Sequence, residues 1–155
     1  VGTSALLVAT ARGLNPPHPD GWIQLVDARD VGDAAVRIAL LANPPRRLLL
    51  GGHNQRLHLL METLANRYGV EEPQGALPAS EAIDLADAAE REPGRPLISR
   101  AIVDLVLHGS PVDDALARQT IDWSPRPLID TLSSWEGWAQ GLGIIEHPPV
   151  IRSEA

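Results

Sequence analysis

The chain has 155 residues, 44% of them hydrophobic, and this size and composition predict one globular domain with a core of its own. Its net charge of −7 argues against nucleic acid and anionic membrane surfaces as partners, because both attract positive charge. The lack of cysteine excludes disulfides, thiolate metal sites and cysteine nucleophiles.

The first third of the chain predicts a helix, a strand and a second helix. Residues 4–12 form an apolar run that indicates a short helix, and the loop 15–21 that follows is rich in turn residues. Residues 22–26 predict a buried strand. Asp27 or Asp30 then supplies the N-cap of an amphipathic helix, because a carboxylate accepts hydrogen bonds from the free N–H groups of a first turn.

A second apolar run, over residues 47–51, predicts another buried strand. A helix that connects two buried strands is typical of the parallel βαβ unit, which we expect over residues 22–51. Such units belong to larger α/β sheets. The sequence therefore predicts an α/β fold that is part of a larger structure.

The rest of the chain is predicted to be helical. Asn54 is placed to cap a helix with apolar residues at helical spacing until Gly69 ends it. Ser80 can cap a shorter helix, and Pro127 suits the first position of the last one. The predicted helices cover residues 54–68, 80–91, 98–108 and 127–142. We expect residues 1–147 to form one domain and residues 148–155 to be a frayed tail.

Two glycines occupy a position where a nucleotide phosphate could bind. Gly51 and Gly52 follow a predicted strand and precede a predicted helix, whose backbone N–H groups would attract a phosphate. The dinucleotide fingerprint needs three glycines at G-x-G-x-x-G spacing, which this stretch lacks. A plain tight turn is the favoured interpretation.

The histidines give two further candidate sites. His53 and His58 are five residues apart, which on a helix turns them away from each other, so no metal site is predicted. His108, Ser110 and Asp113 are the residue types of a hydrolase triad, but the G-x-S-x-G turn that presents a nucleophilic serine is missing. A helix end followed by a turn is favoured here.

Asp27 and Asp30 could also act as a pair of carboxylates in acid–base chemistry, and Trp22 and Trp123 could wall a pocket. Helix capping explains the two aspartates better, because the helix dipole favours negative charge at its N-terminus. The two tryptophans are more often core residues, since a buried indole contributes a large apolar area.

Three segments in order carry a resemblance to a known family. They are Val26-Asp27-Ala28-Arg29-Asp30-Val31, the turn Leu50-Gly51-Gly52 with a helix that ends at Tyr68-Gly69, and Ile121-Asp122-Trp123-Ser124-Pro125. In this order they resemble the second half of extended or atypical short-chain dehydrogenases/reductases. This is the NAD-dependent epimerase/dehydratase superfamily, which includes dihydroflavonol-reductase-like enzymes.

The resemblance implies that the chain is the helix-rich C-terminal part of a Rossmann-type NAD(P)-binding fold. In that family the glycine-rich cofactor turn, the catalytic serine or threonine and a Tyr-x-x-x-Lys pair lie in the N-terminal half, which is absent here. Tyr68 does not match that tyrosine, because Glu72 stands four residues further on and the chain has no lysine. We therefore expect no catalytic residue and no metal in this chain, and NAD or NADP held mainly by the absent half.

The resemblance also implies which residues face a small-molecule substrate, because family loops at these places do so. They are Pro16, Pro17, His18, Trp22, Gln24 and His108. Sugar-nucleotide members of the family carry an arginine just before the strand that here begins at Trp22 and another late in the chain, and neither is matched. An apolar or aromatic carbonyl compound is therefore expected more than a UDP-sugar.

The leading hypothesis is the substrate-binding portion of an NAD(P)-dependent reductase or epimerase, acting on a carbonyl or hydroxyl group and inactive alone. It would be a fragment, a truncated reading frame or one subunit of a split enzyme, with an N-terminal Rossmann half as its partner. The alternative is a stand-alone ligand-binding or protein-interaction module. Its exposed strand at residues 48–50 would then be covered by a homodimer or another partner. A hydrolase using Ser110 and His108 is a third hypothesis.

Composition also predicts where the protein works. Every basic side chain that carries a full charge is arginine, and alanine and proline are abundant, which resembles the codon bias of a high-GC bacterial genome. No apolar run approaches the roughly 20 residues of a membrane span, and the N-terminus lacks the basic flank of a signal peptide. We expect a cytoplasmic protein.

Overall fold

The computed structural model describes residues 3–94 and 98–146. Within them the chain forms seven α-helices and two short β-strands, a helix-rich α/β arrangement. In chain order these are α1 (Thr3–Ala11), β1 (Trp22–Leu25), α2 (Ala28–Ala39), β2 (His53–Arg56), α3 (Leu57–Tyr68), α4 (Ala79–Ala89), α5 (Arg100–Leu107), α6 (Ala115–Ile121) and α7 (Leu128–Gly141). None of these helices is long and apolar enough to cross a bilayer.

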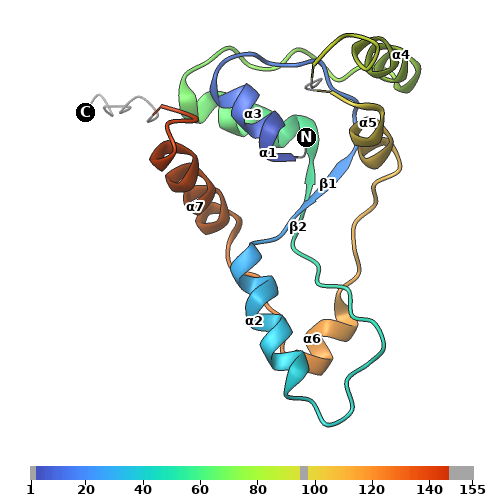
Figure 1. Cartoon of the computed structure of the whole chain (residues 1–155), viewed down its shortest axis with the longest axis vertical. Helices are drawn as coiled ribbons and strands as arrows, with labels where there is room; N and C mark the ends of the chain where they lie inside the picture. Colours follow the sequence, from blue (N-terminus) through green and yellow to red (C-terminus); the bar gives the residue numbers. More distant parts are fainter. Residues whose placement is uncertain (1–2, 95–97, 147–155) are drawn as a thin grey trace.

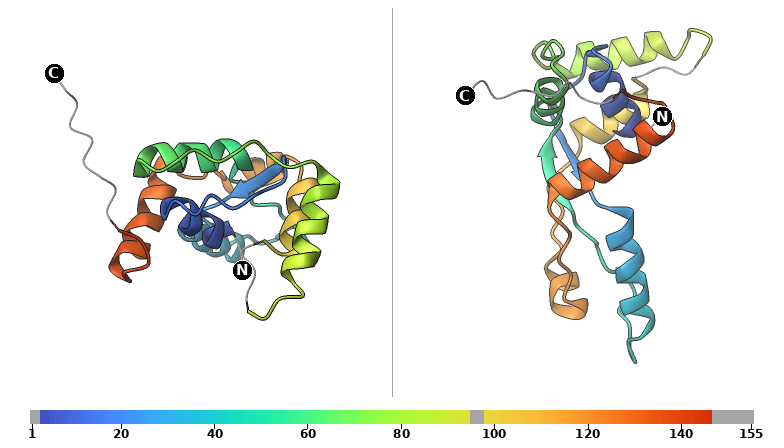
Figure 2. Two further views of the ribbon diagram at one scale, coloured as in Figure 1. Left: turned by 90° about the horizontal axis from the view of Figure 1, so that it is seen from above. Right: turned by 90° about the vertical axis from the view of Figure 1, so that its left-hand side faces the viewer.

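The described residues divide into two regions that are visible in Figure 1. One, which we call the body, contains α1, α3, α4, α5, α7 and the two strands. The other, which we call the arm, consists of α2, residues 40–52 and residues 115–123 with α6. Figure 2 shows α2 and α6 side by side as they project away from the body.

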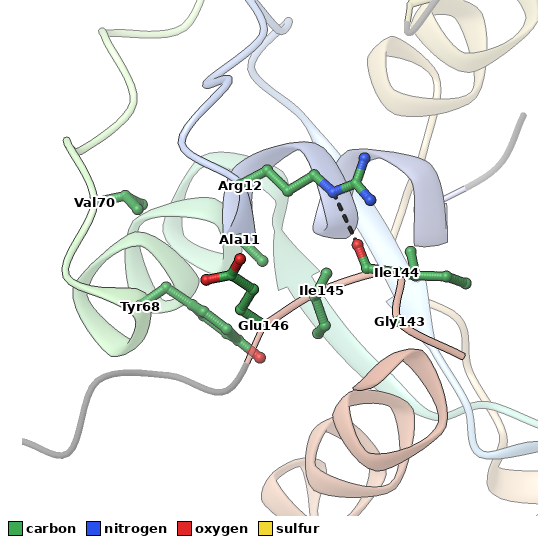
Figure 3. Close-up of a pocket in the computed structure, with 8 residues that line it drawn as sticks. All are labelled: Ala11, Arg12, Tyr68, Val70, Gly143, Ile144, Ile145 and Glu146. Carbon is green, nitrogen blue, oxygen red and sulfur yellow. Dashed lines mark hydrogen bonds between the residues drawn. The ribbon is translucent and has the colours of Figure 1, made fainter. Parts of the chain in front are cut away.

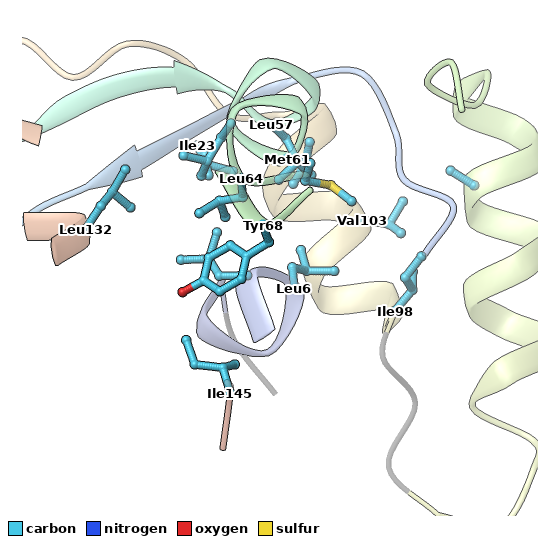
Figure 4. Close-up of a cluster of buried hydrophobic side chains, with 14 of the residues drawn as sticks. Leu6, Ile23, Leu57, Met61, Leu64, Tyr68, Ile98, Val103, Leu132 and Ile145 are labelled. Atoms are coloured by element: carbon cyan, nitrogen blue, oxygen red, sulfur yellow. The ribbon is translucent and has the colours of Figure 1, made fainter. Parts of the chain in front are cut away.

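Helix α3 is the centre of the body's core. Its buried face carries Leu57, Leu60, Met61 and Leu64, at the spacing that places residues on one side of a helix. Helix α1 packs against α3, and Ile23 of β1 reaches the same core (Figure 4). The helix predicted from this periodicity is confirmed, and it ends where expected because Gly69 adopts a left-handed conformation with φ 61°.

The two strands pair antiparallel, with Trp22 opposite Arg56 and Leu25 opposite His53. The predicted parallel βαβ unit over residues 22–51 is therefore wrong. Residues 47–51 form no strand, and the chain pairs with β1 only after it has turned past Gly51-Gly52. This turn brings Gly52 so close to the Leu25 carbonyl that a Cβ atom would lie 1.9 Å from its oxygen.

The apolar run 47–51 has a different role from the one predicted. Leu48 and Leu50 pack against a second cluster formed by Ala34, Ile121 and Trp123, which is the core of the arm. An extended backbone turns its side chains alternately to the two sides even without a neighbouring strand. Among the described residues, no strand pairs with residues 47–51. The predicted burial is confirmed only in part, because Leu48 and Leu50 are half-buried and Leu49 is 54% exposed.

The helix caps agree with the predictions in part. Asp27 is the N-cap of α2, and its Oδ1 accepts a hydrogen bond from the backbone N of Arg29. Asp30 lies inside the first turn and binds Arg126 instead. Asn54 is not a helix cap, because the strand β2 continues to Arg56 and α3 begins only afterwards.

The remaining boundaries differ by small amounts. Helices α4 and α7 begin directly after Pro78 and Pro127, so Ser80 lies inside α4 and Pro127 precedes the first helical residue. Helix α6 was not predicted; its seven residues are too few to show a clear apolar period. Leu142, the last residue of the last predicted helix, lies just after α7 and is 62% exposed. The predicted frayed tail lies outside the described residues.

Candidate functional site

The outer face of the two-stranded sheet gathers two of the predicted substrate residues. Side chains alternate along a strand, so Trp22 and Gln24 share one face while Ile23 turns into the core. The antiparallel register places Arg56 opposite Trp22 and Asn54 opposite Gln24. We call these four side chains the polar face of the sheet, and all four are half-buried.

The side chains of the polar face hold one another in place. The Arg56 guanidinium lies over the Trp22 ring, with its carbon 5.4 Å from the ring centroid, and it also pairs with Asp20. Gln24 donates from Nε2 to Asn54 Oδ1 over 3.1 Å. A planar ring, a fixed cation and two amides are groups that bind a polar organic molecule by stacking and hydrogen bonds.

Asn54 also connects the polar face to the segment after α5. Its Oδ1 accepts a second hydrogen bond, of 3.1 Å, from the backbone N of Val112. Sequence reasoning assigned Asn54 to a helix end and did not identify Arg56 as part of a site. No sequence signal marks these residues as a strand, because all four side chains from His53 to Arg56 are polar and no apolar residue alternates with them.

His18, predicted to face a substrate, is buried below this region and paired with His58 of α3. The two rings stack with centroids 5.2 Å apart, and His18 Nε2 lies 3.0 Å from His58 Nδ1. His18 Nδ1 is 3.2 Å from the Pro16 carbonyl, which can only accept, so neutral His18 carries its proton on Nδ1 and accepts from His58. Burial lowers the pKa of His18, and the neighbouring His58 lowers it further.

Pro16 and Pro17 lie apart from the polar face. They line a cavity of about 350 Å³ together with Glu71, Glu72 and residues of the loop up to Leu77. Asn15 ties the two loops together by donating to the Glu71 carbonyl. The structure therefore places the predicted loop residues at a small loop-lined cavity rather than beside Trp22 and Gln24.

His108 is exposed at the C-terminal end of α5, and its ring Nδ1 bonds the Asp104 carbonyl over 2.9 Å. The next residue, Gly109, lies against the Trp22 carbonyl, where a Cβ atom would come within 2.4 Å of the oxygen. His108 thus sits beside the start of β1. A helix end followed by a turn, the favoured interpretation of this segment, is what the structure shows.

A cluster of two aspartates and two arginines joins the arm to the body. Asp27 and Asp30 are buried, and Arg126, just before α7, binds Asp30 with Nη2 2.6 Å from Oδ1. Arg29 hydrogen-bonds to Asp27 and also donates to Ser134 of α7. Hydrogen bonds from Arg29 hold the pKa of Asp27 far below its usual range, and those from Arg126 lower the pKa of Asp30.

A second surface cavity, of about 450 Å³, lies where α1, α3 and the residues after α7 meet (Figure 3). Arg12 donates from Nε to the Ile144 carbonyl across it, over 2.8 Å. Tyr68 also lines it, and burial followed by repulsion from Glu136 raises the pKa of this phenol. A phenol with a raised pKa stays protonated at neutral pH, which does not suit a proton-transfer tyrosine.

The turn at Gly51 and Gly52 does not fit a dinucleotide phosphate. Gly51 and Gly52 precede a strand, so no helix N-terminus is available there to receive a phosphate. Gly51 also lies against the Asp114 carboxylate, whose Oδ2 would be 2.9 Å from a Cβ atom, and that charge repels phosphate. Within the described ranges, no group of three His, Asp or Glu side chains could hold a metal ion.

The fold is similar to part of two solved structures. The first is the crystal structure of gox2253, 19% identical, with a TM-score of 0.70 over 94% of this chain and 46% of that chain. The second is PA4631, a nucleoside-diphosphate-sugar epimerase from Pseudomonas aeruginosa, 23% identical, with a TM-score of 0.71 over 93% of this chain and 44% of that one. The sequence matches no protein-family model and no curated protein.

These similarities establish the fold alone, because both identities are low. Nearly all of this chain corresponds to less than half of each similar protein. The resemblance inferred from three sequence segments is thereby supported at the level of an epimerase-like fold. The Rossmann sheet itself is not among the described elements, where the only sheet has two strands.

Proposed function

We propose that this chain is the substrate-binding portion of an NAD(P)-dependent oxidoreductase or epimerase that acts on a carbonyl or hydroxyl group of a small organic molecule. The observation that carries the proposal is the fold, shared over 93% of this chain with 44% of a nucleoside-diphosphate-sugar epimerase. The missing majority of that fold would supply the cofactor site and the catalytic groups. This chain would supply a substrate surface.

The polar face and His108 are the proposed substrate contacts. Trp22 and Arg56 offer a stacking surface with a fixed positive charge, and Gln24 and Asn54 offer amide groups next to it. His108 stands beside them at the end of α5. Pro16, Pro17 and His18 would act less directly, by shaping and supporting the loop that leads into β1.

The exposed apolar side chains of the arm favour the proposal that a second half docks onto this chain. Leu40 is 81% exposed and Val36, one turn earlier on α2, is 62% exposed, and Leu49 and Leu116 of the arm are also more than half exposed. Apolar side chains gathered in this way on one region are typical of a surface that another part of a protein covers. A Rossmann half is the partner that the shared fold implies.

The test uses this chain alone and this chain joined to the segment encoded upstream of Val1 in its source genome. We expect no NADH binding by the chain alone, measured by nicotinamide fluorescence, and both binding and turnover by the joined protein. In the joined protein, Gln24→Ala and His108→Ala should raise KM for the substrate. The exposed Asn66→Ala, near the end of α3 in the body and outside both the polar face and the arm, is the control.

Two results would contradict the proposal. One is tight NADH binding by the chain alone. The other is an upstream segment that encodes neither a glycine-rich turn nor a Tyr-x-x-x-Lys pair. Unchanged kinetics in Gln24→Ala and His108→Ala would leave the enzyme assignment standing but remove these two residues from the substrate site.

A stand-alone binding module remains the alternative because the body has a complete core of its own, with Leu57, Met61 and Leu64 fully buried. Such a module should stay soluble, as a monomer or a homodimer, and unfold in one cooperative step without the upstream segment. A chain that aggregates until it is joined to the upstream segment would instead favour the enzyme portion. Sedimentation and urea unfolding separate the two.

A further inference from the structure

The described structure contains a third cavity, of about 510 Å³, that lies where the arm leaves the body. Its walls come from α1, from α7 and from the joint between β1 and α2. This volume is in the range of cavities that hold small organic ligands. It is separate from the polar face of the sheet, since Trp22 and Gln24 do not line it.

The walls of this cavity are mainly apolar. Leu7, Leu25 and Leu132 form its inner side, and Trp135 and Trp138 on α7 contribute two indole rings. Trp138 is 54% exposed, which is unusual for so large an apolar side chain on a helix that also buries Leu132. Two tryptophans one turn apart present flat surfaces on which an aromatic molecule can stack.

The charged side chains at the cavity cancel each other. Asp27 and Arg29 are the only lining residues with a full charge, and Arg29 Nη2 lies 2.6 Å from Asp27 Oδ2. Arg29 also donates to Ser134, so two polar lining residues are occupied by the same guanidinium. A charged ligand would lose water in an apolar cavity without gaining an unpaired counter-ion, which is costly.

We propose that this cavity binds a neutral, largely apolar aromatic small molecule, stacked on Trp135 and Trp138 of α7. The site is made entirely by residues of this chain, so it does not depend on the function proposed above. It would be a second ligand site next to the joint between arm and body. A ligand there would contact α1, α7 and the start of α2 together.

The test uses two dyes that share one aromatic body. N-phenyl-1-naphthylamine is neutral, and 1-anilinonaphthalene-8-sulfonate is its sulfonated, anionic counterpart. We expect the neutral dye to bind the whole chain at one site per molecule, with energy transfer from tryptophan, and the anionic dye to bind at least about tenfold more weakly, because burying an unpaired charge is unfavourable.

Two substitutions on α2 locate the site. Ala28 is exposed and lines the cavity, so Ala28→Leu should fill part of it and weaken binding of the neutral dye at least about tenfold. Ala35 is an exposed alanine on the same helix, outside the cavity, and Ala35→Leu should leave binding unchanged. Circular dichroism and the urea midpoint confirm that both variants are folded.

Three results would overturn the proposal. They are no saturable binding of the neutral dye, equal binding of the two dyes, and equal binding by Ala28→Leu and the unsubstituted chain. A fourth would be dimerisation of the unsubstituted chain that Ala28→Leu abolishes in the absence of dye, since a second copy would then occupy the cavity. Failure here leaves the NADH and turnover experiments unaffected, because they depend on different residues.

Discussion

The body and the arm differ in how fully they bury their large apolar side chains. In the body, Leu57, Met61 and Leu64 of α3 are fully buried because α1, α5 and the sheet surround them. In the arm, the buried cluster around Ala34 and Trp123 is small, and several large apolar side chains of the arm stay exposed.

The difference shows that an apolar stripe on a helix is buried only where enough other elements pack against it. A helix with one apolar stripe is stabilised when that stripe meets other elements. Helix α3 meets several, whereas α2 has only α6 and an extended segment beside it in the arm. The body should therefore be stable by itself, and the arm should open more readily.

The largest expected effect is in the body. Leu64→Ala removes a fully buried side chain at the centre of the core and should lower the free energy of unfolding by about 2–5 kcal/mol. Urea unfolding followed by circular dichroism measures it. Leu59, on the same helix, is 53% exposed, and Leu59→Ala is expected to change stability by less than about 0.5 kcal/mol. Similar losses in both variants would show that α3 is not the centre of the core.

The next effect should be confined to the arm. Ile121→Ala removes a buried side chain from the small cluster and should lower the free energy of opening the arm by about 2 kcal/mol. Hydrogen exchange of amides in α2 and α6 should speed up while that of α3 amides stays unchanged. Leu116→Ala, at a position 54% exposed in α6, is the control. Equal acceleration in α3 would mean that arm and body unfold as one unit.

How far the sequence predicted the structure also differs between the two regions. In the body, the apolar spacing of α3 and the glycine at its end defined the helix correctly, because local periodicity and a left-handed glycine are both sequence signals. In the arm, residues 47–51 were predicted to be a buried strand, but they form no strand, Leu48 and Leu50 are half-buried and Leu49 is exposed. Strand formation depends on a neighbouring chain, which one apolar run does not reveal.

The candidate site shows the same limit. Trp22 and Gln24 were singled out from the sequence, but Arg56 was not, because its position opposite Trp22 follows from the antiparallel register. The pairing of His18 with His58 joins residues 40 positions apart, and no local pattern indicates it. Contacts of this kind depend on how the loop before β1 lies on α3, which is a property of the packed structure.

A smaller effect should appear where arm and body join. Arg126→Met leaves the carboxylates of Asp27 and Asp30 with one partner fewer and should lower the urea midpoint at pH 7. Because Arg126 is not part of either core, hydrogen exchange should speed up at the start of α2 and of α7. Arg118→Met, which breaks a pair whose arginine is 53% exposed, should lower the urea midpoint by less.

The pH dependence of this variant has a definite sign. The pKa values of Asp27 and Asp30 are lowered in the folded state, so their stabilisation is present above the unfolded value, near 4, and is lost as pH falls through the folded values. The difference in stability between Arg126→Met and the unsubstituted chain should therefore shrink below about pH 4. Urea unfolding at pH 7 and pH 3 measures it. A difference that stays constant would mean that Arg126 acts by packing rather than by charge.

The smallest effect should be found in the body, at the end far from the arm. The pKa of His18 is lowered in the folded state by burial and by His58, so the unfolded chain takes up a proton first as pH falls. Stability should decline as pH drops below the unfolded value of about 6.5 and level off below the folded value.

The change in the urea midpoint between pH 7 and pH 5 should be smaller in His18→Gln, which cannot take up this proton. Because the hydrogen bonds of His18 go to Pro16 and His58 in the body, the rate of hydrogen exchange in α6 should not change over this pH range. Faster exchange in α6 as the pH falls would show that the arm and the body are coupled through β1.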